Sequence, residues 1–197
     1  FTGKLGEETV YKISKYLSEK LNCSINQIYT ASTGVIGVQL DPDVVIRSIK
    51  SMFPLKSPDW VKAATAIKTT DTFTKVSRRV CKIDGVEIEL VGIAKGSGMI
   101  APNMSTMLGF IFTNANITSD TLQKLIVSSN EISFNSITVD SDTSTSDTVL
   151  LAATKTAKHK LINSFNDTRL IEFKKNLFSL MLELAKLIIK DGEGASK

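Results

Sequence analysis

The sequence predicts an α/β or α+β sandwich, in which helices and strands share one hydrophobic core. Apolar residues recur at helical spacing over 167–190, a stretch long enough for a core helix. Two apolar runs, Val86–Ile93 and Gly109–Thr113, have the length and the β-branched content of buried strands. Strand–helix pairs mixed with a strand–turn–strand unit give this fold class.

The elements expected before residue 70 have recognisable start signals. An amphipathic pattern over 7–21 places Val10, Ile13, Leu17 and Leu21 on one stripe of a helix. Asp41-Pro42 and Ser57-Pro58 each offer a capping residue followed by a proline at the first helical position. The expected elements are helices at 7–21, 44–52 and 60–67, and a strand that begins at residue 28 and turns at Ser32-Thr33-Gly34.

The second half of the chain alternates between strands and helices. The turn dipeptide Asp84-Gly85 precedes the run 86–93, which alternates at first and then becomes uniformly apolar, as a strand entering a core does. The Asp/Ser/Thr-rich segment 140–147 joins a strand to a helix, and its side chains suit capping of that helix. The expected elements are strands at 86–93, 109–113 and 134–139, and helices at 117–127, 147–158 and 167–190.

Composition excludes several classes of protein. The 197 residues are 42% hydrophobic, which argues against intrinsic disorder, and the longest apolar runs are far too short to span a membrane. The single His159 excludes a His-based zinc site, and its basic surroundings predict a solvated residue. Cys23 and Cys81 are expected to be free buried thiols of a reducing compartment. The lysines are scattered and the net charge is only +4, so nucleic acid is a weak candidate partner.

Hydroxyl and glycine residues cluster in four segments. Ser and Thr make up about a fifth of the chain. An enzyme that acts on acyl groups needs a nucleophile, a base, and donors aimed at the developing oxyanion. One poorly placed His argues against a Ser-His-Asp arrangement. A Ser or Thr nucleophile then needs another base, and one route is its own α-amine, created when the chain is cut just before it. The four segments are 31–37, 68–73, 95–108 and 140–147.

Lys95-Gly96-Ser97-Gly98 also admits another interpretation. Glycines let backbone amides approach an anion, and a lysine lies beside them. The segment lacks the spacing of a P-loop and the helix that follows one. Phosphate binding is therefore a weak alternative.

Five segments together resemble the signatures of the ornithine acetyltransferases, also called glutamate N-acetyltransferases. Lys95–Leu108 is similar to the segment at which that family cleaves its own chain before a Thr, although Ser105 stands where the family most often has Ala. None of the segments is specific alone, but together they cover nearly the whole chain in family order. The other four segments are 32–37, 64–73, 138–147 and 191–197.

The resemblance implies roles for individual residues. Thr106 would be the nucleophile, freed by cleavage of the Ser105–Thr106 bond. Thr33 and Gly34 would form the oxyanion hole, where the loss of one donor typically raises a barrier by about 2.7–4 kcal/mol. The substrate-binding residues would be Thr69, Lys95, Thr106 and Glu193.

These roles describe covalent ping-pong chemistry. A free α-amine has a pKa of about 7.7–8.0, close enough to neutrality to take a proton from the hydroxyl of the same residue. The Thr106 hydroxyl would first attack the Ser105 carbonyl, and water would resolve the resulting ester. It would then accept acetyl from N-acetylornithine and pass it to the amine of glutamate, with no cofactor. Acetyl-CoA is a possible alternative donor in this family.

The resemblance also implies an organisation. The fold would be layered sheets flanked by helices, forming one structural domain with residues 1–105 as an α-chain portion and 106–197 as a β-chain portion. The two chains would stay together, as an α2β2 assembly in the cytoplasm, with no nucleic-acid or membrane partner. Family members carry further segments on both sides, so we expect this chain to correspond to the central portion of such an enzyme.

Two other functions stay open. A hydrolase or peptidase could share the sandwich and the N-terminal nucleophile but let water take the acyl group. An inactive, truncated remnant could bind ligands or partner chains without processing itself. Acetyl transfer from N-acetylornithine to glutamate separates the first function from these two.

Overall fold

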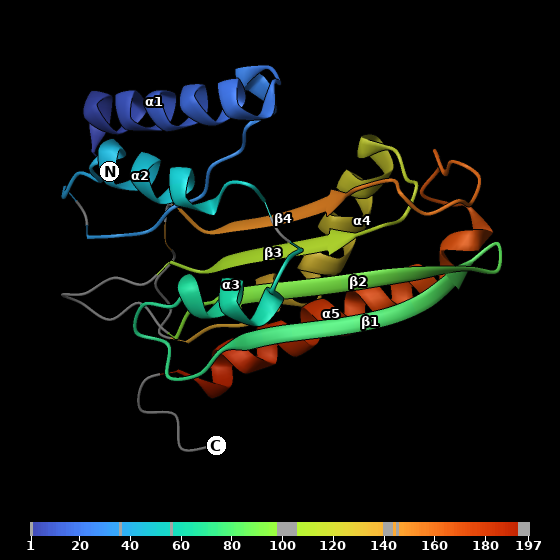
Figure 1. The fold of residues 1–197 in the computed structure, drawn as a ribbon. Helices are drawn as coiled ribbons and strands as arrows, with labels where there is room; N and C mark the ends of the chain where they lie inside the picture. The colour runs from blue at the N-terminus through green and yellow to red at the C-terminus, as the bar shows by residue number, and fades with distance from the viewer. Residues whose placement is uncertain are drawn as a thin grey trace. The chain divides into compact units, whose positions relative to one another are not determined.

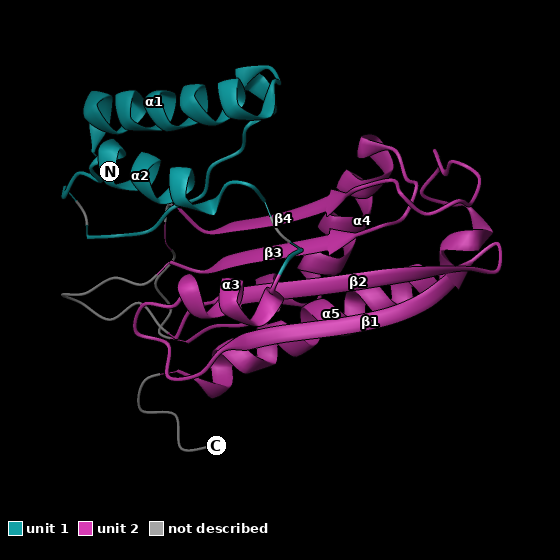
Figure 2. Ribbon diagram, in the orientation of Figure 1, with its two compact units in different colours: residues 1–58 teal, residues 59–197 magenta. Residues whose placement is uncertain are grey.

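The chain forms two compact units in a computed structural model. The structure describes residues 2–35, 37–55, 57–97, 106–139, 144 and 146–192. Residues 1–58 make up the first unit and residues 59–197 the second (Figure 2). The predicted division between residues 105 and 106 concerns cleavage of the chain, and it stays a prediction.

The first unit is a pair of helices with an irregular connection. Helix α1 (Gly3–Leu21) and helix α2 (Pro42–Met52) pack together, with the short 3₁₀ turn η1 (Ile25–Gln27) between them in sequence. The predicted cap of α2 is confirmed, because the Asp41 carboxylate accepts from Asp43 N at 2.9 Å. Gln39 Nε2 donates to the Leu5 carbonyl at 3.2 Å and so ties the connection to α1.

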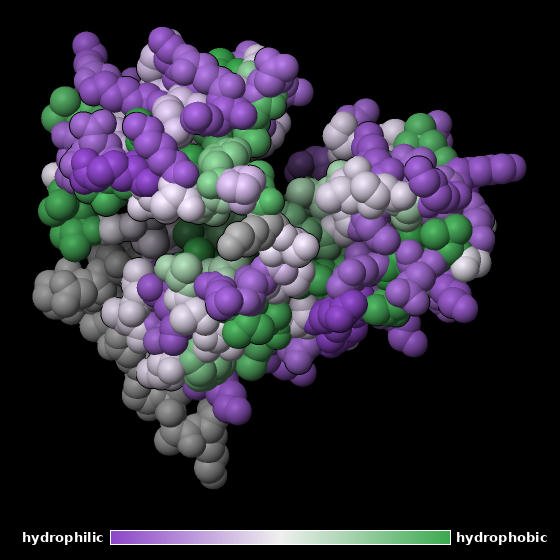
Figure 3. Space-filling model, in the orientation of Figure 1, coloured by the Kyte–Doolittle hydropathy of each residue, from purple (hydrophilic) through white to green (hydrophobic). Residues whose placement is uncertain are grey.

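Two expectations for the first unit were wrong. The buried side of α1 includes Thr9 and Ile13, whereas Val10 and Leu21 are exposed. Hydrophilic side chains also lie along α1 on the face shown in Figure 3. Residues 28–35 form no strand, since they have no pairing partner among the described residues and Tyr29 is 79% exposed.

The second unit is built on one mixed sheet of four strands in the order β1-β2-β3-β4. β1 and β2 form an antiparallel hairpin, β2 and β3 are also antiparallel, and β3 and β4 are parallel. Asp84 and Gly85 both have positive φ, 50° and 76°, as the predicted Asp-Gly turn requires. The strands are β1 (Lys75–Ile83), β2 (Val86–Lys95), β3 (Leu108–Thr113) and β4 (Thr148–Ala153).

Helices cover both faces of this sheet. Figure 1 shows α3 (Trp60–Ala66) in front of β2, and α5 (Ile171–Lys190) behind β1 and β2. On the α5 side, Gly92 and Ile111 meet the apolar stripe of α5, to which α4 (Ser119–Glu131) adds Leu125. On the other side, Trp60 stacks on Phe112 with ring centroids 4.9 Å apart. The mixed α/β class is confirmed, and a second sheet layer stays a prediction.

The structure corrects three details of the prediction. Residues 134–139, predicted as a strand, begin with the 3₁₀ turn η2 (Phe134–Ser136). Residues 147–158, predicted as a helix, contain β4, because the short apolar run 149–153 pairs in parallel with β3. Such runs do not distinguish strand from helix by periodicity. The cap of α3 is Asp59, whose carboxylate accepts from Lys62 N at 3.0 Å, and not Ser57.

Close packing of β2 on α5 makes a testable prediction at Gly92. A Cβ there would lie 2.6 Å from Leu180 Cδ2 and 2.8 Å from Leu184 Cδ1, and both leucines are fully buried. We expect Gly92→Ala to lower the free energy of unfolding by about 1–3 kcal/mol, measured by denaturant titration. Gly109→Ala is the control, because its nearest neighbour would be 3.6 Å away. Equal losses for the two variants would contradict this account.

Among the residues that the structure describes, none of the helices combines the length and the apolar character that crossing a bilayer requires.

Candidate functional site

Thr106 lies immediately before β3 and is almost fully buried. Its Oγ1 is 2.9 Å from the Ser144 hydroxyl, and the Met107 amide donates to Asp147 Oδ1 at 2.9 Å. The parallel ladder of β3 and β4 starts here, since Thr148 N donates to the Met107 carbonyl at 3.1 Å. Parallel pairing therefore brings the Thr106 segment, Ser144 and Asp147 to the same end of the sheet.

Lys95 is the last residue of β2 and pairs with Leu108 of β3. Its side chain is fully buried, and Nζ has no hydrogen-bond partner among the described residues. Burial lowers the pKa of Lys95, and the Lys75 ammonium adds to this effect, whereas the carboxylates of Asp71 and Asp147 oppose it. Thr106 lies two residues before Leu108, the partner of Lys95, and so at the same end of the sheet. This end therefore holds a buried hydroxyl and a buried lysine whose amino group has no hydrogen-bond partner among the described residues.

The loop that contains Thr69 is joined to the end of β2 through Asp71. Asp71 Oδ1 accepts from Gly96 N at 2.7 Å, and Oδ2 accepts from Thr69 N at 3.2 Å. The hydroxyls of Thr70 and Ser97 are 2.8 Å apart. Three of the hydroxyl-rich segments singled out in the sequence thus meet at one end of the sheet.

A buried ionic group lies beneath this loop. Lys75 Nζ is 2.6 Å from Asp71 Oδ1 and 2.5 Å from Asp191 Oδ2, and all three side chains are almost completely inaccessible to solvent. Asp191 also accepts from Thr72 N at 3.0 Å and from the Thr72 hydroxyl. Burial acts to raise the pKa of both carboxyls. For Asp71, hydrogen bonds from Gly96, Lys75 and Thr69 outweigh burial and leave the pKa below its ordinary value.

The same balance holds for Asp191, where burial is outweighed by bonds from Lys75 and Thr72 and the pKa is again lowered. Both groups are therefore carboxylates at neutral pH. Lys75 and Asp191 were not predicted as site residues. Asp191 is the first residue of the signature 191–197, and Lys75 lies two residues after the signature 64–73. A lysine at position 75, four residues after Asp71, carries no signal of its own that it is buried.

The other residues predicted for the site fall into two groups. Thr33 and Gly34 belong to the irregular part of the first unit, between η1 and α2, and Thr33 is half-buried. Their role as an oxyanion hole stays a prediction. Ser105 and Glu193 lie outside the described residues.

His159 was wrongly predicted to be a solvated residue. It is 5% exposed, and its Nε2 accepts from Asn116 N at 2.8 Å. This hydrogen bond joins the segment after β4 to the segment after β3, so the role of His159 is structural. Cys23 and Cys81 are free, as predicted, although Cys23 is only half-buried. Burial raises the pKa of the Cys81 thiol to about 11, so it is not a reactive thiolate. Within the described ranges, no three His, Cys, Asp or Glu side chains cluster as a metal site would require.

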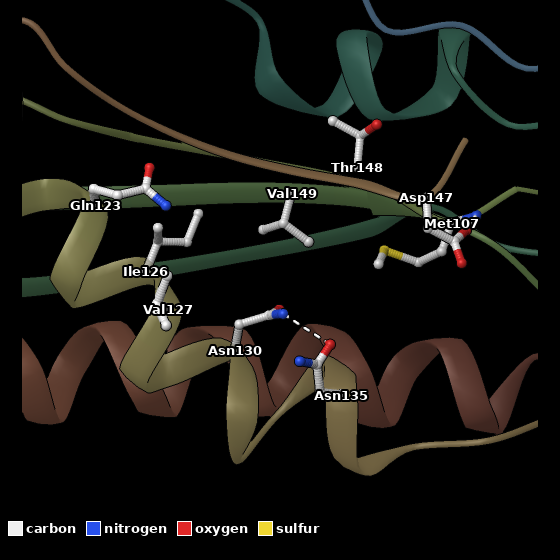
Figure 4. Close-up of a pocket in the computed structure, with 9 residues that line it drawn as sticks. All are labelled: Met107, Gln123, Ile126, Val127, Asn130, Asn135, Asp147, Thr148 and Val149. Carbon is white, nitrogen blue, oxygen red and sulfur yellow. Dashed lines mark hydrogen bonds between the residues drawn. The ribbon is translucent and has the colours of Figure 1, made fainter. Parts of the chain in front are cut away.

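A cavity of about 240 Å³ lies between α4 and β4 (Figure 4). Met107 and Asp147 line it beside the Thr106 segment, and Asn130 and Asn135 are joined there by a 2.8 Å hydrogen bond. Most of the side chains that line the cavity are amides or aliphatic groups, and Asp147 is the one titratable side chain among the nine lining residues. The remaining lining residues are Gln123, Ile126, Val127, Thr148 and Val149.

Comparison with known proteins decides the family. The model of the ArgJ family matches residues 1–197, the whole chain. The chain belongs to the ArgJ family. The resemblance noted in the sequence is thereby confirmed, and the site lies in a stretch that the ArgJ match covers throughout.

Curated relatives agree with this assignment. The "Arginine biosynthesis bifunctional protein ArgJ" of Zymomonas mobilis is 44% identical over 197 residues, which are 100% of this chain and 48% of that protein. Its namesake from Gluconobacter oxydans is also 44% identical, over 100% of this chain and 47% of that protein. The chain thus spans about half the length of the ArgJ relatives it matches.

Among solved structures, the crystal structure of the PH0078 protein from Pyrococcus horikoshii OT3 is similar over 60% of this chain and 39% of that chain. The sequence identity is 10% and the TM-score is 0.41, too distant a likeness to carry an argument.

Proposed function

We propose that this chain is part of an acetyltransferase of arginine biosynthesis that moves acetyl from N-acetylornithine to glutamate through an acetyl-Thr106 intermediate. The observation that carries the proposal is the buried ammonium of Lys95, without a hydrogen-bond partner in the described part of the chain, at the same end of the sheet as the buried hydroxyl of Thr106. A carboxylate of the amino-acid substrate would supply the missing partner of that ammonium. Membership of the ArgJ family supports the choice of substrates.

The first step would be self-cleavage between Ser105 and Thr106. Thr106 Oγ1 attacks the Ser105 carbonyl, the peptide C–N bond breaks, and the acyl group passes to oxygen as an ester while nitrogen takes the proton. Water then hydrolyses the ester, which leaves a carboxylate on Ser105 and a free α-amine on Thr106. The nearby Ser144 hydroxyl is placed to orient the attacking Oγ1.

Acetyl transfer would then use that amine as its base. The amine takes the proton of Oγ1, which attacks the acetyl carbonyl of N-acetylornithine. Thr33 and Gly34 would donate to the oxyanion, and collapse releases the amine of ornithine, which regains a proton from the Thr106 ammonium. Glutamate reverses these steps and leaves as N-acetylglutamate. Lys95, Thr69 and Glu193 would hold the amino-acid part of each substrate.

The proposed enzyme is an assembly of the cleaved chains, and its reaction uses no cofactor. The α and β chains made by cleavage would stay together, in an α2β2 assembly. Acetyl-CoA would be an additional donor, and its use is tested by supplying it in place of N-acetylornithine.

One assay separates this function from its alternatives. The full-length gene product is incubated with N-[¹⁴C]acetylornithine and glutamate, and the products are resolved by chromatography. Labelled N-acetylglutamate is the expected product. Labelled acetate, formed at the same rate with or without glutamate, would instead indicate a hydrolase, and no labelled product would indicate a binding remnant.

A further inference from the structure

Two residues proposed to contact substrate, Thr69 and Lys95, belong to backbone segments whose amides are bonded to one buried ionic group. We infer that Asp71, Lys75 and Asp191, here called the ionic clamp, are positioning residues that hold these two substrate contacts in register. The inference rests on the proposed function and names the device that shapes its substrate site.

Asp71 connects the clamp to both contacts. Its Oδ2 accepts from the backbone amide of Thr69 at 3.2 Å. Its Oδ1 accepts from the amide of Gly96, the residue after Lys95, at 2.7 Å. One buried carboxylate therefore sets both the Thr69 loop and the end of β2.

Asp191 connects the clamp to the end of α5. Its Oδ2 is 2.5 Å from Lys75 Nζ. It also accepts from Thr72 N at 3.0 Å. Since Thr72 follows Asp71 directly, the Thr69 loop and the end of α5 are held by the same three side chains.

The energetics favour a positioning role over a stabilising one. Removing three charges from water is costly, and well-packed apolar residues of similar size are often as stabilising as a buried ion pair. The clamp also acts on Lys95 electrostatically: the Asp71 carboxylate opposes the loss of the Lys95 proton, whereas the Lys75 ammonium favours it. An apolar substitute would have neither effect.

The test substitutes Asp191→Asn in the full-length gene product. The amide retains an acceptor for Thr72 but loses the ion pair, and Lys75 stays neutralised by Asp71. Because a displacement of about 1 Å can cost 10²-fold, we expect kcat/KM for glutamate to fall about 10- to 100-fold, mainly through KM. Self-cleavage, followed by intact mass, is expected to be unchanged.

Glu183→Gln is the matched control. Its carboxylate pairs with Arg79 at 2.8 Å and accepts from the Ser77 hydroxyl at 2.5 Å, so it also joins α5 to β1, but these partners are not members of the clamp. Glu183→Gln is expected to leave KM unchanged. Thr72→Val is the milder second variant, which keeps every charge and removes only the hydroxyl bonded to Asp191. It is expected to raise KM about 3- to 10-fold even if Asp191→Asn does not fold.

The outcomes distinguish the two proposals. A clamp that is merely structural would lower the melting temperature of both clamp variants and leave KM of the folded protein at the wild-type value, which overturns the inference. Wild-type protein that transfers no acetyl, and gains no thermal stability from glutamate or ornithine, would overturn the proposed function and the clamp together.

Discussion

Thr106→Ala is expected to lower acetyl transfer by about 10⁴-fold or more, because it removes the atom to which acetyl is attached. The hydroxyl is buried, 2.9 Å from Ser144, and Ala leaves only a small gap at the start of β3. The fold should therefore persist, as circular dichroism and the melting temperature will show. Steady-state transfer between N-acetylornithine and glutamate is the measurement.

Two matched variants make the Thr106 result interpretable. Thr106→Ser keeps a hydroxyl at the same atom and should retain cleavage and part of the transfer rate. Thr148→Ala removes a threonine hydroxyl at the start of the adjacent strand β4, where it bonds the Ser146 carbonyl, and should leave the rate within about 3-fold. Transfer by Thr106→Ala at more than a few per cent of the wild-type rate would refute the acetyl-Thr106 intermediate.

Lys95→Met should have opposite effects on binding and on stability. The Lys95 ammonium is buried and has no hydrogen-bond partner among the residues described, so replacing it by an apolar side chain of similar length removes a desolvation cost. The melting temperature should therefore stay equal or rise. A charge-assisted hydrogen bond is worth about 1.5–3 kcal/mol, so its loss should raise KM for the amino-acid substrate about 10- to 150-fold. Initial-rate kinetics and thermal unfolding measure the two effects.

The pH dependence gives a second signature of Lys95. Because burial lowers its pKa, the ammonium should lose its proton at a lower pH than an ordinary lysine, and KM of the wild type should rise there. In Lys95→Met that rise should be absent. Lys82→Met, at an exposed position on β1, is the control for loss of a positive charge. A lower melting temperature with an unchanged KM would show that Lys95 is a structural residue.

Sequence periodicity predicted the elements whose partners are local. The helix predicted at 167–190 and the hairpin turn at Asp84-Gly85 are confirmed. Both could be predicted because a long apolar stripe and a turn dipeptide are signals contained in the local sequence. Strand β4 could not be predicted, since its run 149–153 becomes a strand only by parallel pairing with β3, some 40 residues earlier. The wrong assignment of a helix at 147–158 has this cause.

The residues of the candidate site also fall into those that the sequence predicted and those that it did not. Thr106, Lys95 and Thr69 were found through family signatures, and the structure brings their segments to one end of the sheet. Lys75 and Asp191 were not found, because a salt bridge across 116 positions leaves no trace in local composition. Ser144 and Asp147 were interpreted as helix caps, since Asp- and Ser-rich segments usually have that role, whereas here they bond to the Thr106 segment.

Intact mass spectrometry under denaturing conditions tests the central claim most directly. We expect the full-length gene product to yield two chains whose masses correspond to cleavage between Ser105 and Thr106, and Thr106→Ala to yield one. A single uncleaved mass for the wild type, in protein that still transfers acetyl, would contradict the N-terminal nucleophile. Two chains from Thr106→Ala would show that another agent cuts the chain.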